Sequence, residues 1–594
     1  MLSVGGTGGR TALLAVLAAL LLAACTGAPA PPPTPPPPAP EPEPTQIVVA
    51  VDELGAGFNP HLLGHQSTVT TALAGLALPS VFRPDTTGNL QLDRTVATSA
   101  AVISDDPFTV SYELDLQASW TSGAPIAAED FVYLWERMRD EPGVADAAGY
   151  RLITDVRSRA GGKAVDVVFS RPYPAWNTLF ANLLPAHLLK DAPGSWTGAL
   201  ANGFPASGGP FRVVSVDRAR AEVLLTRNDQ YWDTPATLDR LLLRRLDGVA
   251  MADGLGVGDV DVALPEPTDA VRTALSGVTP PPRTEVAPRP VVTDLALRTD
   301  AGPLADTRVR QALAVVIDRA AVRAAAAPEA LAADAFGVAP SEPEYVPTAP
   351  SSRPSTAAAL LRGVGWSRDD EGRWRTPDGE PARLVVGAPA DRATDLAVAA
   401  NLAEQLDAAG IDVTVVAPSG VELFGAATVP PTPPSTAAPA DASPTPTTTV
   451  GPTGAAGATA TPTTAPTTAP AAGVTVDIAV RPRTVGGDSA SELASTFGCT
   501  AALPTRPGVS APTCSESLQP LLDDLVSDPD GSDTAANREA VEKLLWEQVP
   551  ALPLFQPVTL VVSTPGADAV TAVGPGPLTT GPLTGAQRWT EPPR

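Results

Sequence analysis

Short apolar runs alternate with amphipathic segments along most of this chain of 594 residues. Ile47–Val51 is a continuous β-rich run and predicts a buried strand, whereas residues 108–116 alternate apolar and polar positions and predict a half-exposed strand. Helices are predicted at 67–78 and at 307–326, where apolar positions recur at helical spacing. Strands and helices that mix along the sequence predict an α/β fold.

The later part of the chain continues this pattern. A helix at 393–409 ends at Gly410 and leads into a strand at 411–416, which is the usual αβ connection of a mixed sheet. The other predicted elements are strands at 165–169, 211–216, 221–227 and 474–480 and a helix at 131–138. A chain of this length exceeds what one core usually holds, so two or more lobes are expected.

The N-terminus has the composition of an export signal. Arg10 precedes an uncharged apolar stretch at 12–24, which ends in Leu22-Ala23-Ala24. This pattern predicts a signal peptide over 1–24, and the stretch is short for a permanent span, which needs about 20 residues. Cys25 directly after Leu-Ala-Ala resembles the lipobox of bacterial lipoproteins, which implies lipidation and an exported protein anchored to the outer face of the cytoplasmic membrane. The alternative is a cleaved leader with an unmodified cysteine.

Two segments lack the apolar content of a core. Residues 25–45 are mostly Pro and Ala, which predicts either an extended stalk of about 3.1 Å per residue or an ordinary disordered leader. Residues 430–472 consist mainly of Thr, Pro, Ala and Gly, with Asp441 as the only charge. Such a composition does not offset the entropy lost on ordering, so a disordered insertion is expected. An O-glycosylated stalk and an unselected surface insertion are both consistent with it.

Charge and cysteine content narrow the function. The net charge of −25 disfavours nucleic acid and anionic lipid surfaces as partners, although solubility alone would also account for it. With Cys25 assigned to lipid, Cys499 and Cys514 remain as a pair in an oxidising compartment, and a disulfide between them would contribute about 3 kcal/mol. Only three histidines occur and no Cys-x-x-Cys is present, so neither a metal site nor another cofactor is expected.

Catalytic motifs are missing as well. The sequence contains no Gly-x-Ser-x-Gly elbow, no His-Glu-x-x-His and no Gly-x-x-x-x-Gly-Lys phosphate loop. None of the histidines (His61, His65 and His187) has a recognisable catalytic partner nearby in the sequence. We therefore predict that the protein is not an enzyme.

Several separated stretches form a recognisable series. In chain order they are Phe58-Asn59-Pro60, Trp120–Asp130, Leu184–Leu189, Ser207–Phe211 with Arg227–Trp232, Val309–Leu313 with Ile317–Arg319, Gly363–Trp366, Gln405–Leu406 with Gly410–Val413, and Pro553–Pro557. Together they resemble the family 5 extracellular solute-binding proteins of ABC importers, the oligopeptide-, dipeptide- and nickel-binding type. Each stretch is weak by itself, and their order and spacing over 46–416 and 474–590 carry the resemblance.

The resemblance implies a two-lobed α/β fold of the class II periplasmic-binding-protein type, with the extra subdomain of peptide-binding members and a cleft between the lobes. It assigns 46–90, 205–285 and 548–594 to the core of lobe I, 91–204 to its extra subdomain, and 286–547 to lobe II, which 430–472 interrupts. Hinged lobes suit a receptor, because higher affinity for the closed state drives closure.

One stretch departs from the peptide-binding members. In those proteins, an aromatic- and Asp-rich segment that receives the peptide's amino terminus follows the strand that corresponds to Val476–Val480. Here Arg481-Pro482-Arg483 follows, and guanidinium groups match carboxylate and phosphate geometry, which favours an anionic ligand. The alternative is that both arginines face solvent. The predicted ligand contacts are Phe58, Asn59, Arg481 and Arg483, because both stretches should border the cleft.

The segments Val51–Leu62 and Thr71–Phe82 resemble one actinobacterial lipoprotein branch, linked to phosphatidylinositol mannoside and lipoarabinomannan synthesis. Two hypotheses follow. The protein is a lipid-anchored receptor that delivers a peptide-like or other small-molecule solute to an ABC permease for transmembrane transport. Alternatively, it is a cell-envelope accessory protein that binds a phosphatidylinositol mannoside, or its biosynthetic enzyme, in lipomannan and lipoarabinomannan synthesis. The family resemblance implies a monomer in both cases.

Overall fold

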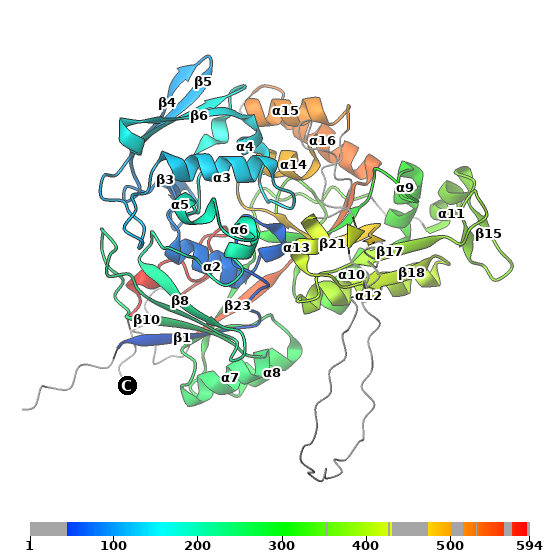
Figure 1. Ribbon diagram of the computed structural model, residues 1–594. Helices are drawn as coiled ribbons and strands as arrows, with labels where there is room; N and C mark the ends of the chain where they lie inside the picture. Colours follow the sequence, from blue (N-terminus) through cyan, green and yellow to red (C-terminus); the bar gives the residue numbers. More distant parts are fainter. Residues whose placement is uncertain are drawn as a thin grey trace, which may run out of the picture. The chain divides into compact units, whose positions relative to one another are not determined.

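β-Sheets of seven, six and four strands, together with helices, make up most of the fold (Figure 1). The computed structural model describes residues 44–350, 354–425, 428–429, 473–499, 515–529, 531–563 and 573–590. Residues Thr45–Arg594 form one unit, distinct from Met1–Pro44. The predicted signal peptide (1–24), Cys25, nearly all of the stalk, the insertion at 430–472 and Cys514 lie outside the described residues.

The seven-stranded sheet forms the core of the first lobe. Its strand order is β12-β23-β11-β1-β10-β9-β8. The strands are β1 (Gln46–Val51), β8 (Phe211–Asp217), β9 (Glu222–Arg227), β10 (Arg240–Arg245), β11 (Val262–Leu264), β12 (Arg283–Pro288) and β23 (Val558–Ser563). The strands predicted at 47–51, 211–216 and 221–227 are confirmed.

Strand β1 lies in the interior of this sheet, parallel to β10 and β11. Ile47 and Val49 pack against helix α2 (Thr68–Ala77), the helix predicted at 67–78. Ala50 points to the other face, where it packs with α7 (Gly248–Val257) and α8 (Asp269–Ser276). Because both faces of β1 are buried, the strand is apolar throughout instead of alternating.

The six-stranded sheet forms the core of the second lobe. Its strand order is β14-β22-β13-β21-β17-β18. The strands are β13 (Val291–Leu297), β14 (Leu331–Ala332), β17 (Arg383–Gly387), β18 (Asp412–Val416), β21 (Ile478–Thr484) and β22 (Ala551–Gln556). Helix α12 (Ala393–Ala408) packs on this sheet and leads into β18, as the helix–Gly–strand pattern predicts.

The four-stranded sheet lies in the extra subdomain, in the order β4-β5-β7-β6. Its strands are β4 (Ala97–Asp105), β5 (Phe108–Leu114), β6 (Ile153–Arg159) and β7 (Ala164–Phe169), and helix α3 (Ala128–Asp140) packs against it. The same hydrophobic cluster includes α14 (Ser489–Phe497), α15 (Gln519–Ser527) and α16 (Thr534–Gln548). Helices from the second half of the chain therefore share a core with this subdomain (Figure 1).

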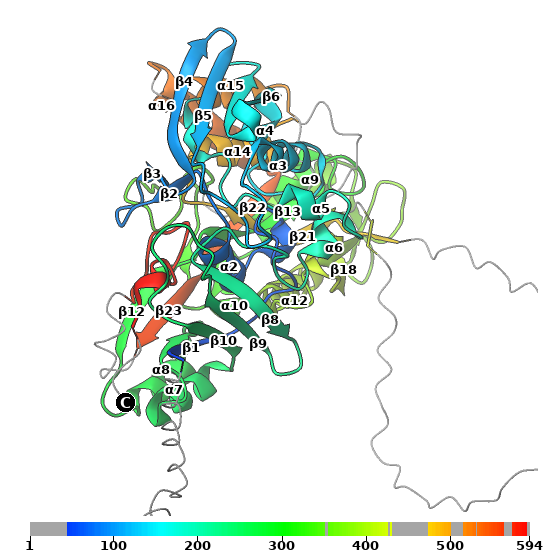
Figure 2. The same cartoon turned by 60° about the vertical axis from the view of Figure 1, so that its left-hand side comes forward.

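The chain crosses between the first two sheets at two points. Strand β12 in the first sheet continues into β13 in the second through Arg289-Pro290, and β22 continues into β23 through Pro557. The N–H of Arg289 donates a hydrogen bond to the carbonyl oxygen of Pro557 (2.9 Å), so the crossings are joined. Figure 2 shows β12 beside β23, with which it pairs antiparallel in the first sheet. The lobe boundaries that the sequence predicts, at 286 and 548, stay predictions.

The helix predicted at 307–326 is two helices, α9 (Thr307–Val316) and α10 (Arg319–Ala326). Ile317 takes an extended conformation, and the side chain of Asp318 accepts a hydrogen bond from the N–H of Ala321, which caps α10. An Asp at the N-cap favours a new helix start, and the apolar periodicity continues across the break and conceals it. No helix within the described ranges is long and apolar enough to cross a membrane.

A buried ion pair lies at the centre of the second sheet. Nε of Arg483 on β21 is 2.8 Å from Oδ2 of Asp294 on β13, and the two side chains are 2% and 0% exposed. Nη1 of Arg483 also donates to the carbonyl oxygen of Phe336 (2.7 Å). Pro482 lies in β21 between Arg481 and Arg483. On the β17 side of β21, the pairing covers only Ile478 and Ala479, so no β17 residue is opposite Pro482 to accept the N–H that proline lacks.

We expect Arg483→Met to lower the free energy of unfolding by about 3 kcal/mol, because it removes the buried ion pair and hydrogen bond between Arg483 and Asp294. Lys190→Met is the matched control, since Lys190 pairs with Glu129 at the surface and a change below about 1 kcal/mol is expected there. Urea denaturation followed by circular dichroism measures both. Equal changes in the free energy of unfolding in the two variants would show that the buried pair stabilises the fold no more than a surface pair does.

Candidate functional site

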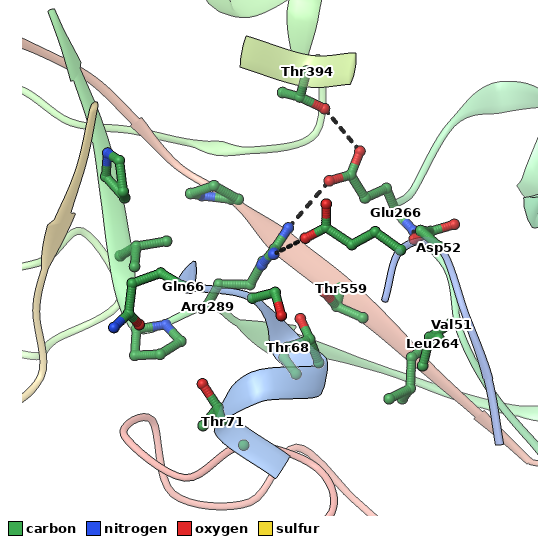
Figure 3. A pocket seen from close by; sticks show the side chains of 18 of the residues that line it. Val51, Asp52, Gln66, Thr68, Thr71, Leu264, Glu266, Arg289, Thr394 and Thr559 are labelled. Carbon is green, nitrogen blue, oxygen red and sulfur yellow. Dashed lines mark hydrogen bonds and ion pairs between the residues drawn. The ribbon is translucent and has the colours of Figure 1, made fainter. Parts of the chain in front are cut away.

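A cavity lies where the two lobes meet the two crossings (Figure 3). We call it the inner chamber, and its volume is about 200 Å³. The first lobe contributes residues that follow β1 and residues at the start of α2, and the second lobe contributes Asp391–Asp395 at the start of α12. Arg289, Pro290 and Pro557 of the crossings complete the lining. The chamber is therefore complete only when the two lobes lie close together.

Strand ends and a helix start place the polar side chains of the first lobe. Asp52 and Glu53 directly follow β1, and Glu266 follows the parallel strand β11 by two residues. The carboxyl ends of parallel strands meet at one edge of a sheet, which is the usual position of a ligand in an open α/β fold. At the same edge Ser67 caps α2, because its Oγ accepts a hydrogen bond from the N–H of Thr70 (3.0 Å).

Arg289 occupies the centre of the inner chamber. Its guanidinium lies between Glu53 (3.3 Å) and Glu266 (3.2 Å). Figure 3 shows Arg289 and Glu266 joined by this interaction. The hydroxyl of Thr394 in the second lobe donates to Oε2 of Glu266 (3.0 Å), while the N–H of Glu266 donates to Oδ2 of Asp52 (2.5 Å). One network of charges and hydrogen bonds therefore spans both lobes.

Acidic groups outnumber basic ones here. The acidic lining residues are Asp52, Glu53, Glu266, Asp391 and Asp395, and the basic ones are Arg245, Arg289 and Arg392. Burial raises the pKa of Asp52 to about 7, with the nearby Glu266 carboxylate adding to the effect. Burial likewise raises the pKa of Asp395 to about 6. A phosphate or carboxylate of a ligand would be repelled from this chamber, whereas hydroxyl groups would find acceptors.

Hydroxyl side chains complete the lining. They are Ser67, Thr68, Thr71, Thr293, Thr394, Thr559 and Thr580. Oγ1 of Thr580 is buried and has no hydrogen-bond partner in the part of the chain that the structure describes. Carboxylates that accept and hydroxyls that both donate and accept suit a neutral, polyhydroxylated ligand.

A second cavity, the outer chamber, adjoins the first and has a volume of about 580 Å³. The two share Gln66, Thr71, Pro290 and Thr580 as lining residues. Aromatic and apolar side chains line much of the outer chamber, among them Phe82 of the first lobe and Tyr150, Tyr173 and Leu179 of the extra subdomain. They face the segment 484–488 and α14 of the second lobe. The outer chamber thus adds aromatic side chains, whereas no aromatic residue of the described chain lines the inner chamber.

The lobes touch on both sides of these chambers, so the structure is a closed form. The hydroxyl of Tyr173 in the extra subdomain lies 2.9 Å from that of Ser491 in α14. Nη2 of Arg392 in the second lobe donates to the carbonyl oxygens of Leu63 (3.1 Å) and Gln66 (2.9 Å) in the first. A ligand in the inner chamber would be enclosed by these contacts.

Comparison with known sequences gives the family. The model for bacterial extracellular solute-binding proteins, family 5, matches residues 92–428. The probable monoacyl phosphatidylinositol tetramannoside-binding protein LpqW of Mycobacterium tuberculosis is 36% identical, over 95% of this chain and 95% of that protein. The chain belongs to family 5. The oligopeptide-binding protein OppA of Mycobacterium bovis is 28% identical over 44% of each chain.

Solved structures show that the family 5 fold extends over nearly the whole chain. The oligopeptide-binding protein AppA of Bacillus subtilis, in complex with a nonapeptide, has a TM-score of 0.69 at 16% identity and covers 92% of this chain and 100% of its own. The periplasmic EDTA-binding protein EppA has a TM-score of 0.66 at 19% identity, with 92% and 97% covered. The predicted two-lobed α/β fold is confirmed.

Two of the predicted ligand residues, Phe58 and Asn59, lie in the interior of the first lobe. Phe58 is fully buried in the core that contains β1 and α2. Asn59 is also buried, where its Oδ1 accepts a hydrogen bond from the N–H of His61 (3.0 Å). Neither lines the inner or the outer chamber, but Pro60 and His61, which follow them, line the outer one. Their ligand role stays a prediction.

The two predicted arginines lie within β21 and not after it, because the strand extends to Thr484. Arg483 is engaged by Asp294, and neither arginine lines either chamber. Arg481 is also buried, and its Nε has no hydrogen-bond partner among the described residues. It shares a strand face with Ala479, which packs with Leu63 of the first lobe, so Arg481 is turned toward the lobe interface. Binding of an anionic group there stays a prediction.

Sequence reasoning missed the acidic and hydroxyl residues of the inner chamber. Asp52 and Glu266 were identifiable as polar residues just beyond buried strands, and Asp395 as an acid in the first turn of a helix. Their convergence was not identifiable, since they come from segments more than 100 residues apart.

Cys499 lines neither the inner nor the outer chamber. Cys499 is disulfide-bonded, and its predicted partner Cys514 lies outside the described residues, so that pairing stays a prediction. Among the described residues, no group of three or more His, Cys, Asp or Glu side chains is placed to hold a metal ion.

We expect Asp52→Asn to stabilise the protein at pH 8 and to leave stability nearly unchanged at pH 4. The pKa of Asp52 rises from 3.8 to about 7 on folding, so its favourable contribution is present below pH 4 and is lost as the pH rises through 7. Asn is uncharged throughout and still accepts the hydrogen bond from Glu266. Thermal unfolding between pH 4 and 8 measures the difference, with the exposed Asp370→Asn as control. A Tm difference that does not grow with pH would contradict the raised pKa.

Proposed function

We propose that this protein binds a mannosylated phosphatidylinositol in the cleft between its lobes and serves envelope glycolipid assembly. The relative named for binding monoacyl phosphatidylinositol tetramannoside matches both chains over 95% of their length at 36% identity. The oligopeptide-binding relative matches 44% of each chain at 28%. The full-length match carries the proposal.

The chemistry of the inner chamber supports a sugar as the enclosed group. Mannose presents several hydroxyls, which can donate to carboxylates such as Asp395 and exchange hydrogen bonds with Thr68 and Thr580. In this arrangement a mannose residue occupies the inner chamber and the phosphate lies outside it.

The outer chamber would hold the remainder of the ligand. Phe82, Tyr173 and Leu179 offer aromatic and apolar surface there. Because Arg483 is paired with Asp294, Arg481 is the remaining candidate of the two for an anionic group.

We further propose that the protein acts at the outer face of the cytoplasmic membrane as a monomer, attached through lipidated Cys25. The lipobox-like sequence before Cys25 and the Pro-rich segment after it support this placement. Delivery of a peptide to an ABC permease is the second candidate function, and its support is the match to OppA.

Native mass spectrometry and calorimetry of the full-length protein test these proposals with two probes, purified monoacyl phosphatidylinositol tetramannoside and a mixture of random nonapeptides. We expect the glycolipid to bind and the peptides not to bind. The double variant Thr394→Val, Asp395→Ala should weaken glycolipid binding about tenfold or more, since it removes two hydrogen-bonding side chains worth about 1 kcal/mol each.

The surface variant Asp370→Asn is the matched control and should bind as the parent does. Binding of peptides alone would establish the importer function instead. If the double variant binds the glycolipid as tightly as the parent does, the sugar does not bind in the inner chamber. The ligand class would still be supported.

A further inference from the structure

The two lobes touch backbone to backbone at a pair of glycines away from the ligand-facing side chains. The short helix η1 (Leu63–His65) of the first lobe lies against α13 (Gly420–Gly425) of the second. A Cβ on Gly64 would lie 2.6 Å from the carbonyl carbon of Gly420 and 2.6 Å from the nitrogen of Val421. A Cβ on Gly420 would lie 2.9 Å from the carbonyl oxygen of Gly64. Neither position admits a side chain while the lobes are in contact.

Local backbone conformation does not require glycine at either position. Neither Gly64 nor Gly420 has a positive φ, so an L-residue fits the conformation that each adopts within its own lobe. The obstructing atoms belong to the opposite lobe and to the main chain, which cannot rotate away as a flexible side chain could. The close approach of the lobes is therefore the feature that excludes a side chain.

Apolar side chains seal the contact around the glycines. Leu63 and Ala145 of the first lobe share a small buried cluster with Val416, Leu423 and Phe424 of the second. Loss of this cluster on opening would expose apolar surface, so the contact favours the closed form once it is reached.

The glycine contact is connected to the inner chamber through residues of both lobes. Gln66 and Ser67, which line the chamber, follow Gly64 by two and three residues. In the second lobe, Arg392 donates hydrogen bonds to the carbonyl oxygens of Leu63 and Gln66. Arg392 itself lines the chamber, together with the residues at the start of α12. The depth to which η1 and α13 approach thus sets the distance across the chamber.

We propose that Gly64 and Gly420 are positioning residues, a contact that sets how far the lobes close and thereby how long a ligand is retained. This inference goes beyond the proposed function, since it holds for any solute in the cleft. It makes closure depend on two residues that line neither chamber.

Interlobe distance in the full-length protein tests the proposal directly. Nitroxide labels are placed on Val214→Cys in β8 and Val415→Cys in β18, which are exposed positions in the two lobes. Double electron–electron resonance then compares the parent with Gly64→Ala and Gly420→Ala, without ligand and with monoacyl phosphatidylinositol tetramannoside. Protein without the introduced cysteines is the blank, and far-ultraviolet circular dichroism checks that each lobe is folded.

We expect the parent to show a short-distance population that both alanine variants lose. Gly425→Ala, in the same helix with no atom within 4 Å of its added Cβ, should behave as the parent does. The double variant Gly64→Ala, Gly420→Ala should be no worse than either single one, because both report one contact. For a bound probe, the dissociation rate should rise about tenfold while the association rate changes little.

Distance distributions that coincide in the parent and the alanine variants would overturn the proposal. So would a parent that never shows the short distance, because the contact would then not form in solution. A parent that closes without ligand and does not bind the glycolipid would refute the proposed function and leave the glycine contact supported.

Discussion

The position of Arg289 ties the hinge of this protein to its ligand cleft. Its backbone joins the two crossings through the hydrogen bond to Pro557, and its guanidinium lies between Glu53 and Glu266. Without that cation, Glu53 and Glu266 would share a poorly hydrated space with Asp52 and would lose the positive charge that pairs with both of them. The connection between the lobes and the tolerance of so many acids in one chamber both depend on this residue.

Burial of acids makes closure and ligand binding one process. Asp52 and Asp395 have raised pKa values because the closed structure removes them from water. Hydrogen bonds from ligand hydroxyls would replace the lost water and offset that cost. Closure is then favoured when a polyhydroxylated solute is present, which is the differential affinity that a hinged receptor needs.

The fold by itself leaves the ligand open. Structures with TM-scores of 0.69 and 0.66 to this chain belong to proteins described as binding oligopeptides and EDTA, respectively. Function resides in the side chains that the cleft brings together, not in the arrangement of sheets. In this protein those side chains are carboxylates and hydroxyls at the inner end and aromatic groups such as Tyr173 at the outer end.

The sequence by itself determined much of the secondary structure, because strand and helix periodicity is local. It also indicated the lobed fold, because the stretches that match the family are spread along the whole chain. It placed β1, α2 and α12 within one or two residues. It did not show that Arg483 forms a buried ion pair with Asp294, which lies 189 residues away in the sequence. Only the tertiary structure decided the site, because Asp52, Glu266 and Asp395 meet through parallel strand ends and lobe closure, and neither leaves a periodic signal in the chain.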